Sequence, residues 1–194
     1  MGNKSKRYER RKQQETKRKL IWIGAGVIAL ILIGYIVWQL IRPSAGERIP
    51  IQASSGEHVP EGEDPGPFIS DPPTSGRHYA TEFEAGFYEP SDPQASVPYP
   101  EGYLIHNLEH GYVIFWYNCE IIDAGECSNL KTSIRDVMAE FDNTKLIAFP
   151  WSSTGAPLVM TSWGQLQEFQ ALDPERAVSF IRSNRNRAPE PNAP

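Results

Sequence analysis

The longest apolar stretch of the chain comes early, at residues 20–41. It contains no charged side chain, and ~20 apolar residues in a helix span the ~30 Å hydrocarbon core of a bilayer. Trp22 lies near one end, and Tyr35 and Trp38 lie near the other, as in the aromatic belts of membrane-spanning helices. The pattern therefore predicts one transmembrane helix, too long for the apolar part of a cleaved signal peptide.

Three further apolar runs predict strands in the second half of the chain. Residues 112–117 are β-branched and aromatic with no polar alternation, which is typical of a strand buried on both faces. The pattern predicts two more strands, at residues 145–151 and 157–163. A short turn separates this second pair, so we expect the third strand to run antiparallel.

Two stretches show helical spacing instead. The first follows Ser128, a residue that can cap a helix, and its apolar positions are Leu130, Ile134, Val137 and Phe141. The second begins at Asp173-Pro174-Glu175, which combines an N-cap side chain, a proline at the first helical position and an acid in the first turn. Its apolar positions are Ala177, Val178, Phe180 and Ile181.

The predicted order is β-α-β-β-α, preceded by long proline-rich loops. A strand–helix–strand unit implies a right-handed parallel crossover, so we expect an α+β or α/β domain at residues 67–187. Its small mixed sheet would carry helices on one face. This outline is thioredoxin-like, although no C-x-x-C motif is present. We expect the polar, proline-containing end, residues 188–194, to be a frayed tail.

Composition separates this domain from the membrane helix. Residues 42–66 contain no aromatic side chain and are rich in Pro, Gly, Ser and Glu. Such a segment cannot bury enough apolar surface to offset its ordering entropy. We therefore predict a flexible linker there, which begins to order near residues 49–51 or His58.

Charge then assigns the sides of the membrane. Residues 1–19 carry nine Lys or Arg against two Glu, whereas residues 43–194 carry nine against 22 Asp or Glu. The positive-inside rule makes the basic tail cytoplasmic and the acidic domain extracytoplasmic, so we predict a single-pass protein of the bacterial cytoplasmic membrane. A cleaved signal ending near Ala45-Gly46 is the alternative. The tail lacks interleaved aromatic residues, and its expected partner is the lipid bilayer rather than nucleic acid.

The chain has two cysteines, Cys119 and Cys127, on either side of the first strand-to-helix connection. An extracytoplasmic compartment permits a disulfide, which would contribute ~2–3 kcal/mol by closing this loop. A pair of thiolate metal ligands is the alternative.

The candidate chemistry lies in the stretch His106-Asn107-Leu108-Glu109-His110-Gly111, directly before the first strand. On a helical turn His106 and His110 face the same way, and this spacing lets two imidazoles bind one metal. Gly111 suits the position that ends such a turn. His-x-x-Glu-His is also a peptidase signature, but that motif needs a long helix. Structural histidines that hold the loops on the sheet are the other alternative.

The two remaining histidines lie on earlier loops. His78 follows Pro72-Pro73 and Gly76, and prolines with a fixed φ make a stiff loop that can hold an imidazole in one orientation. His58 lies in the predicted linker. Taken alone, each is also consistent with an ordinary surface position.

These residues resemble a family of bacterial membrane-anchored domains of unknown function. Its members show the motifs G-x-x-H, PPxxGxH, GxY, HxLEHG and TAWG in this order. The counterparts here cover residues 56–190 and are Gly56 with His58, Pro72 to Tyr79, Gly86-Phe87-Tyr88, His106 to Gly111, and Thr161-Ser162-Trp163-Gly164. Gly56 stands two residues before its histidine rather than three, and Ser162 replaces alanine. Many members carry a cysteine where this chain has Ala85, so no cysteine role carries over.

The resemblance implies that His58, His78, His106 and His110 all lie in signature motifs. Four imidazoles would suit Cu or Zn, with Glu109 behind them as a group that orients an imidazole. The leading hypothesis is therefore a membrane-anchored domain that binds copper or zinc, and whether it is also an enzyme stays open. The alternatives are a non-catalytic accessory or assembly subunit of a membrane complex, with structural histidines, and a zinc hydrolase with Glu109 as its base.

Overall fold

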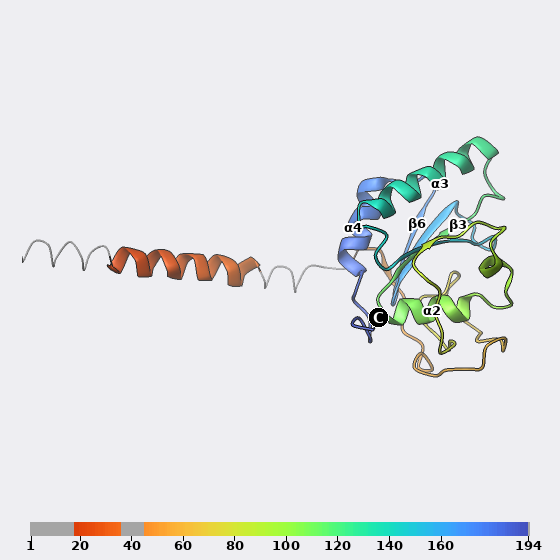
Figure 1. The fold of residues 1–194 in the computed structure, drawn as a ribbon, viewed down its shortest axis with the longest axis horizontal. Coiled ribbons are helices and arrows are strands. Elements are labelled where there is room, and N and C mark those ends of the chain that lie inside the picture. The colour runs from red at the N-terminus through yellow and green to blue at the C-terminus, as the bar shows by residue number, and fades with distance from the viewer. Residues whose placement is uncertain (1–17, 36–44, 194) are drawn as a thin grey trace, which may run out of the picture. The chain divides into compact units, whose positions relative to one another are not determined.

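The structure is a computed structural model that describes residues 18–35 and 45–193. The chain forms two compact units, Met1–Pro43 and Ser44–Pro194. In the first unit, Arg18–Tyr35 is a helix (Figure 1) whose length and composition would allow it to cross a membrane. The rest of the predicted span and nearly all of the basic tail lie outside the described residues.

The second unit is built on a six-stranded mixed sheet, which confirms the mixed α+β class. The strand order is β1-β6-β5-β3-β4-β2. The central strand β3 pairs in parallel with β4 and antiparallel with β5, as the pattern predicted. The strands are β1 (Glu47–Arg48), β2 (Gly86–Phe87), β3 (Val113–Tyr117), β4 (Leu146–Pro150), β5 (Leu158–Ser162) and β6 (Gln165–Phe169).

Alternating side chains of the central strand enter two apolar cores. Val113 and Phe115 pack with α3 (Ala124–Ala139) and α4 (Pro174–Asn184). Ile114 and Trp116 pack instead with α2 (Glu101–Glu109), through its apolar side chains Leu104 and Leu108. Figure 1 shows α2 and α3 on opposite sides of the sheet. The expectation of helices on one face is therefore correct for α3 and α4 and wrong for α2.

Helix capping explains where α3 and α4 begin. Asp123 caps α3 in a capping box with Glu126, so this helix starts before the predicted cap, Ser128. The predicted cap of α4 is confirmed, since the Asp173 side chain accepts a hydrogen bond from the Arg176 backbone N–H at 3.2 Å.

The linker prediction for residues 42–66 needs correction from residue 45 onward. Glu47 and Arg48 form β1, which pairs with the edge of β6. Ile49 N–H donates to the Gly164 carbonyl at 3.0 Å, and Asn184 Nδ2 donates to the Ala45 carbonyl at 2.9 Å. These hydrogen bonds to the backbone order a segment that has few apolar side chains, and composition does not reveal them. The folded unit therefore begins well before residue 67.

The C-terminal tail is also ordered, against expectation. Lys145 Nζ donates hydrogen bonds to the carbonyls of His110, Pro191 and Ala193. Glu190 N–H donates to the Glu109 carbonyl at 3.0 Å. Lys145 and the Glu190 backbone together hold residues 190–193 against the end of α2, where the predicted metal ligands lie.

Candidate metal centre

Helix α2 presents apolar side chains to the sheet and polar side chains to the loops that cover it. His106, Glu109 and His110 are all buried near its C-terminal end. His110 is the C-cap, and Gly111 has φ +83°. A Cβ at Gly111 would lie 2.7 Å from Asn186 Cα. The predicted helical turn, with glycine ending it, is therefore confirmed.

The two loops that carry His58 and His78 pair directly with each other. The histidines form an isolated parallel β-bridge, in which Val59 N–H donates to the His78 carbonyl at 2.8 Å and His78 N–H donates to the Glu57 carbonyl at 3.2 Å. These backbone hydrogen bonds bring side chains that are 20 positions apart in sequence to the same place.

Tyr79 connects this pair of loops to α2. Its N–H donates to the Gly102 carbonyl at 3.0 Å, and its ring lies where a Gly102 side chain would be, 2.4 Å from the position of an added Cβ. Glycine at position 102 therefore lets the loop with His78 approach the helix closely.

His58, His78, His106 and Glu109 converge into what we call the inner cluster. One ligand atom from each residue lies within 4.8 Å of every other. The centroids of the His58 and His78 rings are 4.8 Å apart, and each lies 5.5 Å or less from the His106 ring centroid. His78 is fully buried, whereas His58 is exposed, so the cluster reaches from the interior to solvent.

The hydrogen bonds of His78 define which of its nitrogen atoms faces the cluster. Nδ1 lies 3.0 Å from the Gly76 carbonyl, to which it must donate. Nε2 lies 2.9 Å from Glu109 Oε2. With the Nδ1 proton given to Gly76, Nε2 and Oε2 both carry lone pairs, so a proton or a metal cation must lie between them. A metal-binding histidine usually donates one ring N–H to a backbone carbonyl or a similar acceptor and binds the metal through its other ring nitrogen.

His106 is the member whose ring nitrogen is least satisfied. Its Nδ1 is buried and has no hydrogen-bond partner among the described residues. Burial, together with the neighbouring imidazoles of His110, His78 and His58, lowers the pKa of His106 to about 4. His106 is therefore neutral at physiological pH, which is the form that ligates metals.

A second group, the outer cluster, consists of Glu82, His106 and His110. His110 Nδ1 lies 2.7 Å from Glu82 Oε2, and the centroids of the His106 and His110 rings are 4.3 Å apart. On its other side, His110 Nε2 lies 3.7 Å from Glu190 Oε2.

Asn107 holds the backbone next to Glu82 in place. Its side-chain oxygen accepts from Phe83 N–H at 3.1 Å, and its Nδ2 donates to the Phe83 carbonyl at 2.8 Å. Sequence reasoning missed Glu82, Asn107 and Glu190. Asn107 could have been found from its place inside the histidine stretch, but nothing local distinguishes the two glutamates from other surface acids.

The four predicted histidines thus lie together but in two overlapping groups. Three of them share the inner cluster with Glu109, whose oxygen lies among the candidate ligand atoms rather than behind them. His110 belongs to the outer cluster. The predicted disulfide Cys119–Cys127 is present beside the start of α3, with an S–S distance of 2.01 Å, so the alternative of two thiolate ligands is wrong.

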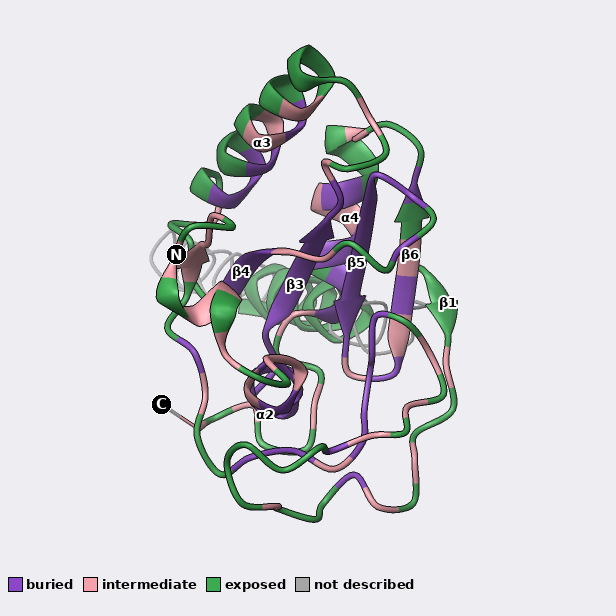
Figure 2. Ribbon diagram, turned by 90° about the vertical axis from the view of Figure 1, so that its right-hand side faces the viewer, coloured by how far each residue is buried: buried purple, intermediate pink, exposed green. Residues whose placement is uncertain are grey.

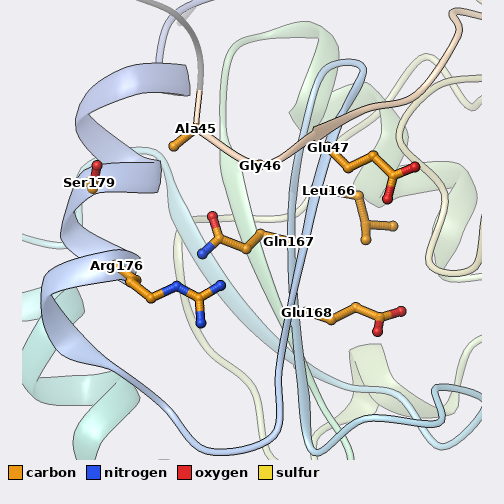
Figure 3. Close-up of a pocket in the computed structure, with 8 residues that line it drawn as sticks. All are labelled: Ala45, Gly46, Glu47, Leu166, Gln167, Glu168, Arg176 and Ser179. Atoms are coloured by element: carbon orange, nitrogen blue, oxygen red, sulfur yellow. The ribbon is translucent and has the colours of Figure 1, made fainter.

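A hollow of about 530 Å³ lies elsewhere, between β1, β6 and α4 (Figure 3). Its lining includes Arg176 and Gln167 and contains no histidine. The Arg176 guanidinium lies 5.0 Å from the centre of the Phe169 ring, so this charge already packs within the fold. The histidine clusters remain the stronger candidate site.

Comparison with known proteins agrees with the resemblance to an uncharacterised family. Residues 64–194 match the family described as a protein of unknown function, DUF3105. The match includes His78, His106, Glu109 and His110 and begins after His58. No curated protein and no solved structure matches the chain.

Proposed function

The chain belongs to the DUF3105 family of proteins of unknown function, and from this premise we propose that its folded domain binds a divalent transition metal in the inner cluster. The observation that carries the proposal is the convergence of three imidazoles and one carboxylate within 4.8 Å. Imidazole nitrogen with a carboxylate oxygen suits copper or zinc. His58, His78, His106 and Glu109 would hold the ion, and the Gly76 carbonyl would orient His78.

The role proposed is binding rather than hydrolysis. In the proposed site Glu109 is itself a ligand of the ion, with its Oε2 atom 2.9 Å from His78 Nε2, so this carboxylate is not free to accept a proton from water. A general base must be within hydrogen-bond reach of the proton that it removes. A zinc hydrolase that uses Glu109 as its base is therefore the weaker reading.

In this proposal the helix Arg18–Tyr35 anchors the domain in the bacterial cytoplasmic membrane. Its apolar composition and the basic residues that precede it support an orientation with the N-terminus in the cytoplasm. The metal would then be bound on the extracytoplasmic side.

An accessory subunit of a membrane complex, with purely structural histidines, is the second candidate. The hydrogen bonds of His78 and His110 favour it, because each ring has protein partners. The buried and unpartnered Nδ1 of His106 favours the metal, because a structural histidine normally has its buried polar atoms satisfied.

The test uses the full chain purified in mild detergent. After chelator treatment, the protein is loaded separately with Zn²⁺ and Cu²⁺ and dialysed, and retained metal is measured by mass spectrometry. We expect Glu109→Gln to lower the metal affinity by more than the roughly 10- to 100-fold that altering a partner of a metal ligand costs, because Glu109 is itself a proposed ligand. Glu168→Gln, the same change on an exposed part of β6, should have no effect. Wild-type protein that retains neither metal, and whose melting temperature neither metal changes, would overturn the proposal.

A further inference from the structure

We propose that the outer cluster is a second cation position, so that the centre holds two divalent ions. This inference rests on the proposed function of the inner cluster. The outer position is formed by Glu82 Oε2 and His110 Nδ1, which lie 2.7 Å apart, with a ligand atom of His106 within 4.8 Å of both. It overlaps the inner cluster only at His106, because His58, His78 and Glu109 are not part of this group.

The surroundings of His110 resemble those of a metal ligand. Its ring lies between two carboxylates, with Glu82 at Nδ1 and Glu190 at Nε2, 3.7 Å away. At 2.7 Å a proton or a cation must lie between His110 Nδ1 and Glu82 Oε2, so an ion bound there would replace the Nδ1 proton, and Glu190 would add its negative charge from 3.7 Å.

The fold fixes the backbone at or beside both glutamates. The two hydrogen bonds between Asn107 and the Phe83 backbone fix the residue that follows Glu82. The hydrogen bond from Glu190 N–H to the Glu109 carbonyl ties the tail to α2. The Glu82 side chain is 28% exposed and that of Glu190 is 62% exposed. An ion can therefore reach this position directly from solvent.

Charge and ligand type separate the two positions. Glu82 supplies the outer ion with its own anionic ligand, so the ion does not depend on Glu109. The inner position can use three imidazoles and a carboxylate, whereas the outer one has at most two imidazoles and Glu82. The inner ion should therefore bind more tightly, and water would complete the outer coordination.

His106 couples the two positions. A neutral imidazole carries one nitrogen lone pair and can bind only one of the two ions. Once the inner ion holds His106, the outer ion must bind with Glu82 and His110 alone, and it is also repelled by the charge of the first. We therefore expect two unequal binding phases rather than two independent sites.

The experiment titrates the metal-free full chain in detergent with Zn²⁺, followed by calorimetry and by metal analysis. Wild-type protein should bind two ions per chain, one tight and one weak. Glu82→Gln should abolish the weak phase and leave the tight one, and His110→Asn should do the same. His58→Asn should weaken the tight phase and leave the ion at Glu82.

Three other outcomes would contradict either the second cation position or the proposed function. One ion per chain in the wild type, with Glu82→Gln indistinguishable from it, overturns the second position and leaves the proposed function standing. Loss of all metal in Glu82→Gln, with an unchanged melting temperature of the metal-free protein, shows one joint site and also overturns the inference. Absence of any Zn²⁺ or Cu²⁺ binding in the wild type overturns the proposed function itself.

Discussion

The sheet with its two outer helices and the layer of histidine loops are held together by different forces. The α3/α4 face is packed with apolar side chains such as Phe115, Ile134 and Phe180, each fully buried. The histidine layer depends on backbone hydrogen bonds, such as those between His78 and the loop of His58, and on paired polar side chains. Figure 2 shows buried positions concentrated in the strands and α2, while the loops around α2 alternate between buried and exposed. Substitutions in the two regions should therefore separate stability from metal binding.

The largest effect is expected in the apolar core. Phe180→Ala removes a ring that is fully buried between α4 and the sheet, and such truncations cost about 3–5 kcal/mol. We expect a large fall in melting temperature and, through unfolding, a loss of metal. Chemical denaturation followed by circular dichroism measures the first effect. A decrease in the free energy of unfolding of less than about 1 kcal/mol would show that this face stabilises the fold less than its packing implies.

The disulfide should come next and should affect stability alone. Replacing Cys119 and Cys127 by serine removes a cross-link over eight positions, which is expected to cost ~2–3 kcal/mol. The pair lies at the start of α3 and touches neither cluster, so the folded variant should bind Zn²⁺ as the wild type does. Calorimetry checks the number of Zn²⁺ ions bound per chain. A changed number would show that the disulfide influences the histidine clusters, although it does not contact them.

Gly102→Ala tests the junction between the regions. The new Cβ would lie 2.4 Å from the Tyr79 ring, so the loop that carries His78 must move, and forced overpacking typically costs about 1–3 kcal/mol. We expect weaker metal binding at temperatures where the protein is still folded. Gly155→Ala is the control, since its Cβ would have nothing within 4 Å.

The smallest effect on stability should accompany a large effect on binding. His58→Asn changes an exposed side chain, so the free energy of unfolding of the metal-free protein should change by less than about 0.5 kcal/mol. The inner ion should nevertheless bind more weakly, because one of its imidazoles is gone. Thermal unfolding with and without Zn²⁺ checks both statements, and an equal metal-induced shift in variant and wild type would exclude His58 as a ligand.

Elements with strong local patterns could be predicted well. Two examples are the apolar run of β3 and the Asp-Pro-Glu start of α4, because each signal consists of consecutive residues. In contrast, β6 was missed because its two buried side chains, Leu166 and Phe169, enter opposite cores and leave no alternation. Strand β1 was missed because it is held by its backbone at the sheet edge rather than by apolar side chains.

The sequence by itself determined the four histidines, the spacing of His106 and His110 on one helical turn, and the glycine that ends it. These are local features, decided by helix periodicity and backbone freedom. Only the tertiary structure decided that Glu109 joins the inner cluster, that His110 turns toward Glu82, and that Glu190 completes its surroundings. The contacts join residues 31 and 28 positions apart. These contacts form because backbone hydrogen bonds join the loops and Lys145 holds the tail. Such pairings between distant residues produce no periodic pattern in the sequence.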